Sequence, residues 1–234
     1  MTRFWLILAA FLGLAATVVP ASADIVYTLS NGGSILPTPG NYGTVTVSQT
    51  ASQLSAGIIQ VKIDLLSTER LLTTGGHDGI VFSLTGSPDL TSITVVSANA
   101  SGFTVKPLGG SYSDSPFLGP FEYAIAWNGN GAGSATETSI TFDLNFGSSL
   151  ALSPTLFALT SGTYFAVDIG RGCSTTTNPN NGKTSTSCAA TGPIATGDPV
   201  VVPEPSTVAM SIAGLMGLAG FAMIQRRRKL VRAV

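Results

Sequence analysis

The side chain best suited to acid–base or metal chemistry in this chain is its one histidine, His77, in the run from Thr73 to Gly79. A histidine beside a carboxylate, here Asp78, is suited to act as a general base or a metal ligand. Adjacent side chains on a strand point to opposite faces, however, and a zinc site needs further ligands, whereas the chain has no second histidine. We therefore expect a turn formed by Asp78 and Gly79, with His77 packed or capping, and we expect no metal and no cofactor.

Hydrolytic chemistry is the second possibility, and carboxylates would have to carry it. A glycosidase uses two carboxyl groups on opposite sides of one cleft, and Glu122, Asp143 and Asp168 lie in or beside predicted strands. Sequence spacing does not show whether these three converge. No Gly-x-Ser-x-Gly elbow marks a serine nucleophile. We expect the protein not to be an enzyme, with a glycan hydrolase as the least favoured alternative.

Aromatic side chains could bind carbohydrate, because their rings stack on the faces of sugars. The candidates are Tyr42, Tyr112, Phe117, Phe121, Tyr123 and Trp127. The segment 111–127 is rich in them and contains Pro116 and Pro120, which are typical of loops. Most aromatic residues of a β-sandwich belong to its core, so packing is the expected role. A carbohydrate-binding (lectin-like) or ice-binding module remains the alternative, with this segment as the place where a glycan would bind.

The two cysteines, Cys173 and Cys188, bracket a polar loop of Ser, Thr, Asn, Gly, Pro and Lys. Such a loop is too polar to pack by itself. In an oxidising compartment two cysteines in this arrangement favour a disulfide. A metal or redox pair would need partner residues that the sequence does not offer, so we expect the disulfide.

The elements that must position these side chains are short strands. Residues 44–49 and 58–66 alternate apolar and polar side chains, the pattern of half-buried strands. Further strands are expected at 25–29, 79–84, 92–97, 102–105, 122–127, 139–144 and 163–169. Glycine-rich turns separate the strands, and no internal repeat is visible. We predict an all-β fold, an antiparallel β-sandwich of jelly-roll type.

Two segments of the body do not follow the strand pattern. Residues 150–160 are the one candidate for a short helix, which Pro154 would limit. Residues 191–202 contain two prolines and two glycines, which is typical of a linker. We therefore expect a β-sandwich body at 24–190 and a linker at 191–202.

Residues 1–23 have the pattern of a secretory signal peptide. One basic residue is followed by an apolar stretch at 4–19 and then by a proline. Ala21 and Ala23 place small side chains at the −3 and −1 positions of a cut before Asp24. Export through this segment would put the body outside the cytoplasm.

The other end of the chain predicts a membrane anchor. An uncharged apolar run of 19 residues, 206–224, follows Pro203, Glu204 and Pro205. As a helix, the run would span about 28 Å, close to the thickness of the hydrocarbon core of a bilayer. The basic residues after it are Arg226, Arg227, Arg228 and Lys229. By the positive-inside rule they stay in the cytoplasm, and the two prolines hold the backbone around Glu204 extended outside the membrane.

The Pro-Glu-Pro tripeptide, the apolar run and the basic end together resemble the PEP-CTERM sorting signal of Gram-negative bacteria. The resemblance covers about 203–234. It implies recognition and cutting of the tail by an exosortase, a membrane processing enzyme, during export to the cell surface or extracellular matrix. The same tail is also labelled an ice-binding-protein C-terminal domain, which describes the tail and not the body. An ordinary C-terminal anchor is the alternative and gives the same topology.

The charge of the body excludes some partners. Residues 24–202 contain five basic and eleven acidic residues, a formal charge of −6. Nucleic acid binding depends on neutralising phosphates, and docking on anionic lipid depends on basic clusters, so we expect neither. We predict an exported protein that is anchored by its C-terminal helix before processing and then reaches the cell surface or matrix. The resemblance implies a structural role associated with exopolysaccharide.

Overall fold

The computed structural model describes residues 24–32, 40–73, 78–86, 88–114, 117–129 and 136–202, together with Gly214 and Gly217. The chain divides into two units, Met1–Ala23 with Pro203–Val234, and Asp24–Val202. The predicted signal peptide at 1–23 lies outside the described residues, as does the predicted spanning helix at 206–224 apart from the two helical glycines. Within the described part of the chain, no helix has the length and apolar character needed to cross a membrane.

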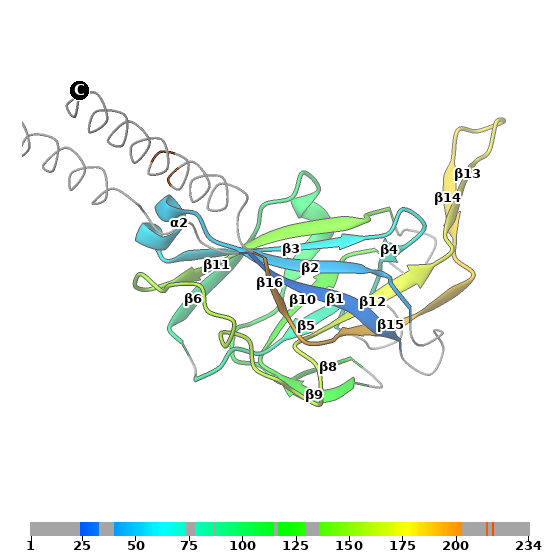
Figure 1. The fold of residues 1–234 in the computed structure, drawn as a ribbon. Coiled ribbons are helices and arrows are strands. Elements are labelled where there is room, and N and C mark those ends of the chain that lie inside the picture. Colours follow the sequence, from blue (N-terminus) through cyan, green and yellow to red (C-terminus); the bar gives the residue numbers. More distant parts are fainter. Residues whose placement is uncertain are drawn as a thin grey trace, which may run out of the picture. The chain divides into compact units, whose positions relative to one another are not determined.

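The unit Asp24–Val202 is built from antiparallel strands. They are β1 (Asp24–Gly32), β2 (Gly43–Ser48), β3 (Ile58–Leu65), β4 (Arg70–Leu71), β5 (Ile80–Phe82), β6 (Leu90–Val95), β7 (Phe103–Val105), β8 (Tyr112–Asp114), β9 (Phe117–Phe121), β10 (Tyr123–Trp127), β11 (Ser139–Phe146), β12 (Phe165–Arg171), β13 (Ser174–Thr177), β14 (Thr184–Ser187), β15 (Ala190–Thr196) and β16 (Val200–Val202). The predicted all-β antiparallel class is confirmed (Figure 1).

Twelve of these strands form one sheet. Its main path runs β6-β11-β3-β2-β1-β15-β12-β5-β10-β7, with β16 paired to β1 and β4 paired to β12. The strands β13 and β14 form a separate hairpin, and so do β8 and β9. The prediction of a sandwich implied two sheets, whereas here the facing layers belong to one continuous sheet.

This sheet bends round until it is nearly closed. The rings of Phe82 on β5 and Phe142 on β11 lie 5.8 Å apart between centroids, although five strands separate β5 from β11 in the sheet. The edge strands β6 and β7 also contact each other. The inner faces of the strands therefore surround a single core.

The alternating pattern of the sequence correctly predicted which side chains enter this core. Val45, Val47 and Ile59 are fully buried, as are the next inward positions Val61 and Ile63. The side chains between them on β3 are polar and face outward. Because a strand alternates its faces with a period of two, burying one face fixes the register of β2 against β3.

Aromatic rings fill the middle of the core. Tyr27 on β1 is fully buried, and its ring centroid lies 5.3 Å from that of Phe165, 5.3 Å from that of Tyr164 and 6.1 Å from that of Phe157. A smaller apolar cluster lies on the outer face of β5, β10 and β12, where Val81, Phe121, Ala124 and Ala166 are buried with Tyr112 packed against them. The hairpin β8–β9 supplies both Tyr112 and Phe121 to that cluster.

Two predictions about elements are wrong. Residues 150–160 form no helix, and their positions Phe157 and Thr160 instead make isolated β-bridges. The expected linker at 191–202 consists largely of β15 and β16, because β15 fills the place between β1 and β12 and is buried there. The body therefore extends to Val202 and not to residue 190.

One helix was missed by the sequence analysis. The helix α2 (Ala51–Ala56) begins after Thr50, whose side chain accepts a hydrogen bond from the backbone N–H of Gln53, while the Gln53 side chain accepts one from the N–H of Thr50. It ends at Gly57, whose φ of 68° lies in the left-handed region. This is a capping box followed by a glycine C-cap, so local signals define both ends of the helix.

Candidate functional site

The site with the clearest geometry is the place where the two ends of the body meet. In the antiparallel ladder of β1 and β16, Asp24 is the partner of Val202, Ile25 of Val201 and Val26 of Val200. Cα atoms of such partners lie about 4.5–5.5 Å apart. The residue expected to follow the signal-peptide cut is therefore fixed next to the residue that precedes the Pro-Glu-Pro tripeptide.

The strand β16 is a short outer addition to the sheet. It continues the path of β15 along the same edge of β1 after a turn at 197–199, where the N–H of Gly197 donates to the carbonyl of Thr28 at 3.2 Å. Its three valines remain exposed, with 61% of Val200, 46% of Val201 and 44% of Val202 accessible. The main chain thus holds β16 in place, and its side chains add little burial.

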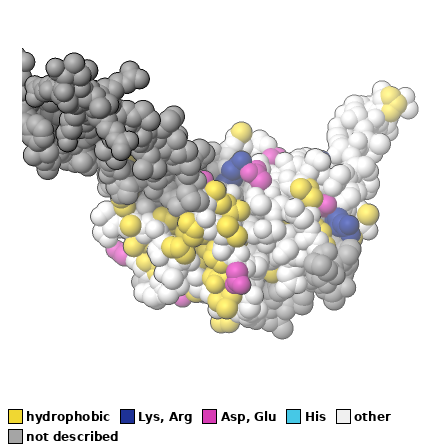
Figure 2. Space-filling view, in the orientation of Figure 1, with side chains coloured by type: hydrophobic (Ala, Val, Ile, Leu, Met, Phe, Trp, Pro, Cys, Tyr) yellow, Lys and Arg dark blue, Asp and Glu magenta, His cyan; other side chains and the backbone are white. Residues whose placement is uncertain are grey.

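Figure 2 shows hydrophobic side chains gathered on the face where β16 lies in Figure 1. The valines of β16 are among the few large hydrophobic side chains that are exposed in the described residues. On the inner side of the same ladder, Ile25 is buried in the core. The strand β1 is therefore firmly packed, while its partner β16 lies at the surface.

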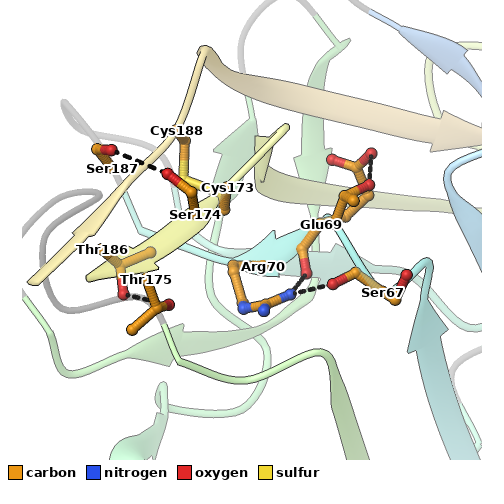
Figure 3. Close-up of a disulfide and its surroundings, with 10 residues drawn as sticks. Ser67, Glu69, Arg70, Cys173, Ser174, Thr175, Thr186, Ser187 and Cys188 are labelled. Atoms are coloured by element: carbon orange, nitrogen blue, oxygen red, sulfur yellow. Dashed lines mark hydrogen bonds between the residues drawn. A yellow bond between two sulfur atoms is a disulfide. The ribbon is translucent and has the colours of Figure 1, made fainter. Parts of the chain in front are cut away.

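The predicted disulfide between Cys173 and Cys188 is confirmed. It closes the base of the hairpin β13–β14, which projects from the body (Figures 1 and 3). The N–H of Cys173 donates to the carbonyl of Thr68 at 2.8 Å, which ties the hairpin base to the segment before β4. The strand β12 runs beneath the bridge, and a Cβ placed on its Gly170 would lie 2.5 Å from the Cys188 sulfur.

The region beside the disulfide holds a buried carboxylate. Glu69 is only 4% exposed, and Oε1 accepts a hydrogen bond from the Thr68 hydroxyl at 3.1 Å. The guanidinium of Arg70 donates to the carbonyls of Ser67 and Glu69 at 2.8 and 2.7 Å (Figure 3). These contacts stabilise the turn before β4, and in the described residues no group of three potential metal ligands is present.

The hairpin itself is covered with hydroxyl groups. All eight strand positions of β13 and β14 are Ser or Thr, and seven of the eight are exposed. Opposite hydroxyls form cross-strand pairs, at 3.2 Å between Thr175 and Thr186 and at 3.3 Å between Thr177 and Thr184. The hairpin therefore presents mainly exposed, uncharged hydroxyl groups, and Thr186 is its one buried strand position.

The histidine considered first, His77, lies outside the described residues. Its neighbour Asp78 is described, and its Oδ2 accepts a hydrogen bond from the N–H of Ser113 at 3.0 Å. Gly79 has a φ of 78°, in the left-handed region, and its carbonyl accepts from the N–H of Asp168 at 2.7 Å. In the described residues, Asp78 and Gly79 thus connect the start of β5 to β8 and β12.

The three carboxylates that a hydrolase would use lie in different places. Asp168 is buried on β12 opposite Gly79, whereas Glu122 accepts from the N–H of Leu84 at 3.4 Å. Leu84 lies five positions after Gly79, and five steps of extended chain at about 3.3 Å each place these two residues about 16 Å apart. Asp143 on β11 alternates with the core-facing Phe142 and Leu144, so it points away from the core, and it accepts from the side chain of Gln60 at 3.0 Å. The structure does not bring the three together.

The aromatic candidates for sugar binding are mostly packed inside the body. Tyr42, Phe121 and Tyr123 are buried, and Trp127 is half-buried with its ring 4.9 Å from that of Phe103. Tyr112 is half-buried, and its hydroxyl donates to the carbonyl of Pro107 at 2.6 Å. The side chain of Phe117 lies outside the described residues. The expected packing role is confirmed for the three buried rings.

Two core tyrosines have perturbed acidities. Burial, and then the nearby Tyr164, raises the pKa of Tyr27 far above its usual value of about 10. Burial, and then the adjacent Glu122, raises the pKa of Tyr123. The cause in both cases is that a buried phenolate would lose its hydration. These shifts belong to the core and create no reactive group at the surface.

The predicted sorting residues lie outside the described residues. They are Pro203, Glu204 and Pro205, the basic residues Arg226, Arg227, Arg228 and Lys229, and the signal-cut residues Ala21 and Ala23. Comparison with family models nevertheless finds a match at residues 201–229, to the PEP-CTERM protein-sorting motif. The match begins inside β16, at Val201. No curated protein and no solved structure matches the chain.

Proposed function

From the premise that this chain carries a PEP-CTERM protein-sorting motif, we propose that its function is to be delivered to the cell surface or extracellular matrix as a structural protein associated with exopolysaccharide. The motif implies export, anchoring in the membrane and processing by an exosortase, a membrane enzyme. The match at residues 201–229 is the observation that carries the proposal.

The residues of the tail suit this sequence of events. Pro203 and Pro205 have no N–H and a fixed φ, which disfavours a helix around Glu204 and favours the extended backbone that a membrane enzyme could take up. The apolar run 206–224 is long enough to hold the chain in a bilayer. The basic residues behind it, beginning at Arg226, oppose its passage across the membrane. The uncut precursor is thereby anchored with the body on the outer side.

The body has features of a protein made for the outside of a cell. Its one disulfide joins the only two cysteines of the chain, and disulfides persist in oxidising compartments. The Ser/Thr hairpin β13–β14 presents hydroxyl groups without charge, and hydroxyls can exchange hydrogen bonds with those of a polysaccharide. These features support association with exopolysaccharide.

A carbohydrate-binding module is the second candidate. The observation that favours it is again the hairpin β13–β14, whose exposed hydroxyl groups can bind sugars. The rings of Phe121 and Tyr123 are buried and cannot stack on a sugar. We propose no enzymatic activity for the body, a view supported by the separate positions of Glu122, Asp143 and Asp168. A glycan array with the unit Asp24–Val202 would distinguish specific recognition of one sugar from a structural role, in which no single glycan is selected.

Replacement of Glu204 tests the delivery proposal. In the Glu204→Gln variant we expect the tail to stay on the chain, so that full-length protein accumulates in the membrane while the body folds normally. Asp198→Asn is the matched control, because it also removes one carboxylate, at an exposed position that lies before β16 and outside the match. Immunoblots of membrane and extracellular fractions with antibody to the body provide the measurement. Full-length Glu204→Gln protein absent from the membrane would contradict the proposal.

A further inference from the structure

The sheet of the body runs directly into the sorting motif. The strand β16 ends at Val202, the motif match begins at Val201, and the tripeptide starts at Pro203. No free residue lies between the last ladder pair, Asp24 with Val202, and the motif. Three residues, the length of the tripeptide, span at most about 10 Å at about 3.4 Å each. Any cut at the tripeptide therefore falls within that distance of a folded strand.

An enzyme that cuts a peptide must take up residues on both sides of the bond. Extended peptides commonly bind by adding a strand, with main-chain hydrogen bonds to the partner. The residues immediately before the tripeptide are Val200, Val201 and Val202, and their main chain is already paired with β1. One edge of the β16 backbone is thus already paired with β1, and the body lies next to it.

β16 makes few contacts with the rest of the body. It has three ladder partners, and its valine side chains are largely exposed. The strand β1 keeps β2 on one edge and β15 on the other when β16 is absent. Segments with little burial and short ladders open at a low free energy compared with the whole domain. The moving part is therefore β16, because Ile25 and Tyr27 hold β1 in the core.

We propose that exosortase takes up β16 together with the Pro-Glu-Pro tripeptide, and that β16 must first separate from the edge of β1. The paired state is the closed form of the processing site, and the released state is the form that is cut. This inference rests on the proposed processing of the tail. It adds that the folded body regulates the access of the enzyme to its substrate.

A disulfide across the ladder tests the release of β16. Val26 and Val200 are direct partners, with Val26 half-buried and Val200 exposed, so the double variant Val26→Cys, Val200→Cys can lock β16 to β1. We expect this variant to be processed at least tenfold more slowly than the native protein in the cells that produce it. The control lock is Thr46→Cys with Lys62→Cys, which joins partners on β2 and β3 and leaves β16 free. It should be processed at the native rate.

Insertion of a spacer tests whether the lock acts by restricting the access of the enzyme to the tripeptide. Six Gly and Ser residues inserted between Val202 and Pro203 add about 20 Å of extended chain, so the enzyme no longer needs β16. The locked variant with the spacer should regain processing at close to the native rate. Mass spectrometry verifies in every variant that the new disulfide has formed and that Cys173 is still joined to Cys188.

The outcomes separate the two proposals. Processing of the locked variant at the native rate would overturn the release of β16 while leaving the sorting proposal intact. A locked variant that stays uncut even with the spacer would also overturn it, because the block would then not be one of access. Absence of any processing in the native protein would overturn the sorting proposal, and this inference with it.

Discussion

Asp24 and Val202 are direct partners in the ladder of β1 and β16. Asp24 is also the residue that follows the predicted signal peptide, and Val202 is the residue that precedes the sorting tripeptide. The first and the last strand of the body, β1 and β16, therefore pair with each other at this point of the sheet. The two processing events proposed for the chain act on neighbouring positions of one folded unit.

The burial of β15 leads to a prediction about truncation. A chain that ends at residue 189 should fail to fold, because it loses β15 with the buried Ile194 and Ala195 and leaves edges of β1 and β12 unpaired. A chain that ends at Pro199 loses only β16 and should fold, with a slightly lower Tm than one ending at Val202. Circular dichroism during heating shows whether each of the three chains is folded and gives the Tm of those that are. Equal stability of the shortest chain would show that β15 is dispensable.

The disulfide should stabilise the body. Cys173 and Cys188 are 15 residues apart, and a loop of that size restricts the unfolded chain by about 3 kcal/mol on the entropic model. The Cys173→Ser, Cys188→Ser variant should lose up to about that free energy of unfolding. Urea unfolding at equilibrium provides the value. The control is the native protein with reductant, which should show the same loss, and two free thiols in the exported native protein would contradict the pairing.

A side chain at Gly170 should lower the free energy of unfolding while the disulfide is present. A Cβ there would lie 2.5 Å from the sulfur of Cys188 and 2.9 Å from that of Cys173. We expect Gly170→Ala to cost about 1–3 kcal/mol, the range for overpacking. Gly197→Ala is the matched control, since the nearest atom to its new Cβ would be the Ser30 hydroxyl at 3.9 Å.

The background without cysteines gives this prediction a second test. In the Cys173→Ala, Cys188→Ala protein the two sulfurs are gone, so Gly170→Ala should cost less than in the native protein. Urea unfolding of the four proteins completes a double-mutant cycle. An equal cost in both backgrounds would place the clash elsewhere than at the disulfide.

Tyr27 makes the stability depend on pH at the alkaline end. Its pKa is raised in the folded protein by burial, whereas in the unfolded chain the phenol ionises near its usual value of about 10. Above that pH the unfolded state therefore holds fewer protons, and the free energy of unfolding falls as pH rises. Below it, the phenol is neutral in both states and contributes no pH dependence.

Replacement of Tyr27 by Phe isolates this effect. The Tyr27 hydroxyl has no hydrogen-bond partner among the described residues, so Tyr27→Phe should keep or slightly raise stability at pH 7 and weaken the alkaline loss. Tyr112→Phe is the contrast, because that hydroxyl donates to the carbonyl of Pro107, and its loss should cost about 1 kcal/mol. Denaturant midpoints at pH 7 and pH 11 compare the three proteins. An alkaline loss unchanged in Tyr27→Phe would assign it to other groups.

The sequence predicted the strands whose burial depends on local alternation. Residues 58–66 show the period of two, and β3 buries Ile59, Val61 and Ile63 as expected. The helix α2 was missed, although Thr50, Gln53 and Gly57 supply a capping box and a C-cap, because its six residues are too few for a helical period. The capping signals at its two ends could have predicted this helix.

The segment 191–202 was misjudged for a different physical reason. Its prolines and glycines are typical of a linker, and Pro193 also lacks the N–H that a ladder needs. β1 ends at Gly32 opposite Ile194, so among the residues that the structure describes Pro193 has its strand neighbour in β12. Its place in the sheet depends on partners more than 20 positions away in the sequence, which composition cannot show. The closure of the sheet and the pairing of Asp24 with Val202 are hidden from sequence patterns for the same reason.

The location of β15 beside β1 sets the time at which the body can fold. In the proposed export the chain crosses the membrane from its first residue onward, so β1 would cross early, but one edge of β1 pairs only with residues near 196 and 200. Pairings between such distant segments form slowly and late. In the proposed export, the body can therefore complete its native structure only when the residues immediately before the apolar run 206–224 have crossed the membrane, because β15 and β16 are its last strands.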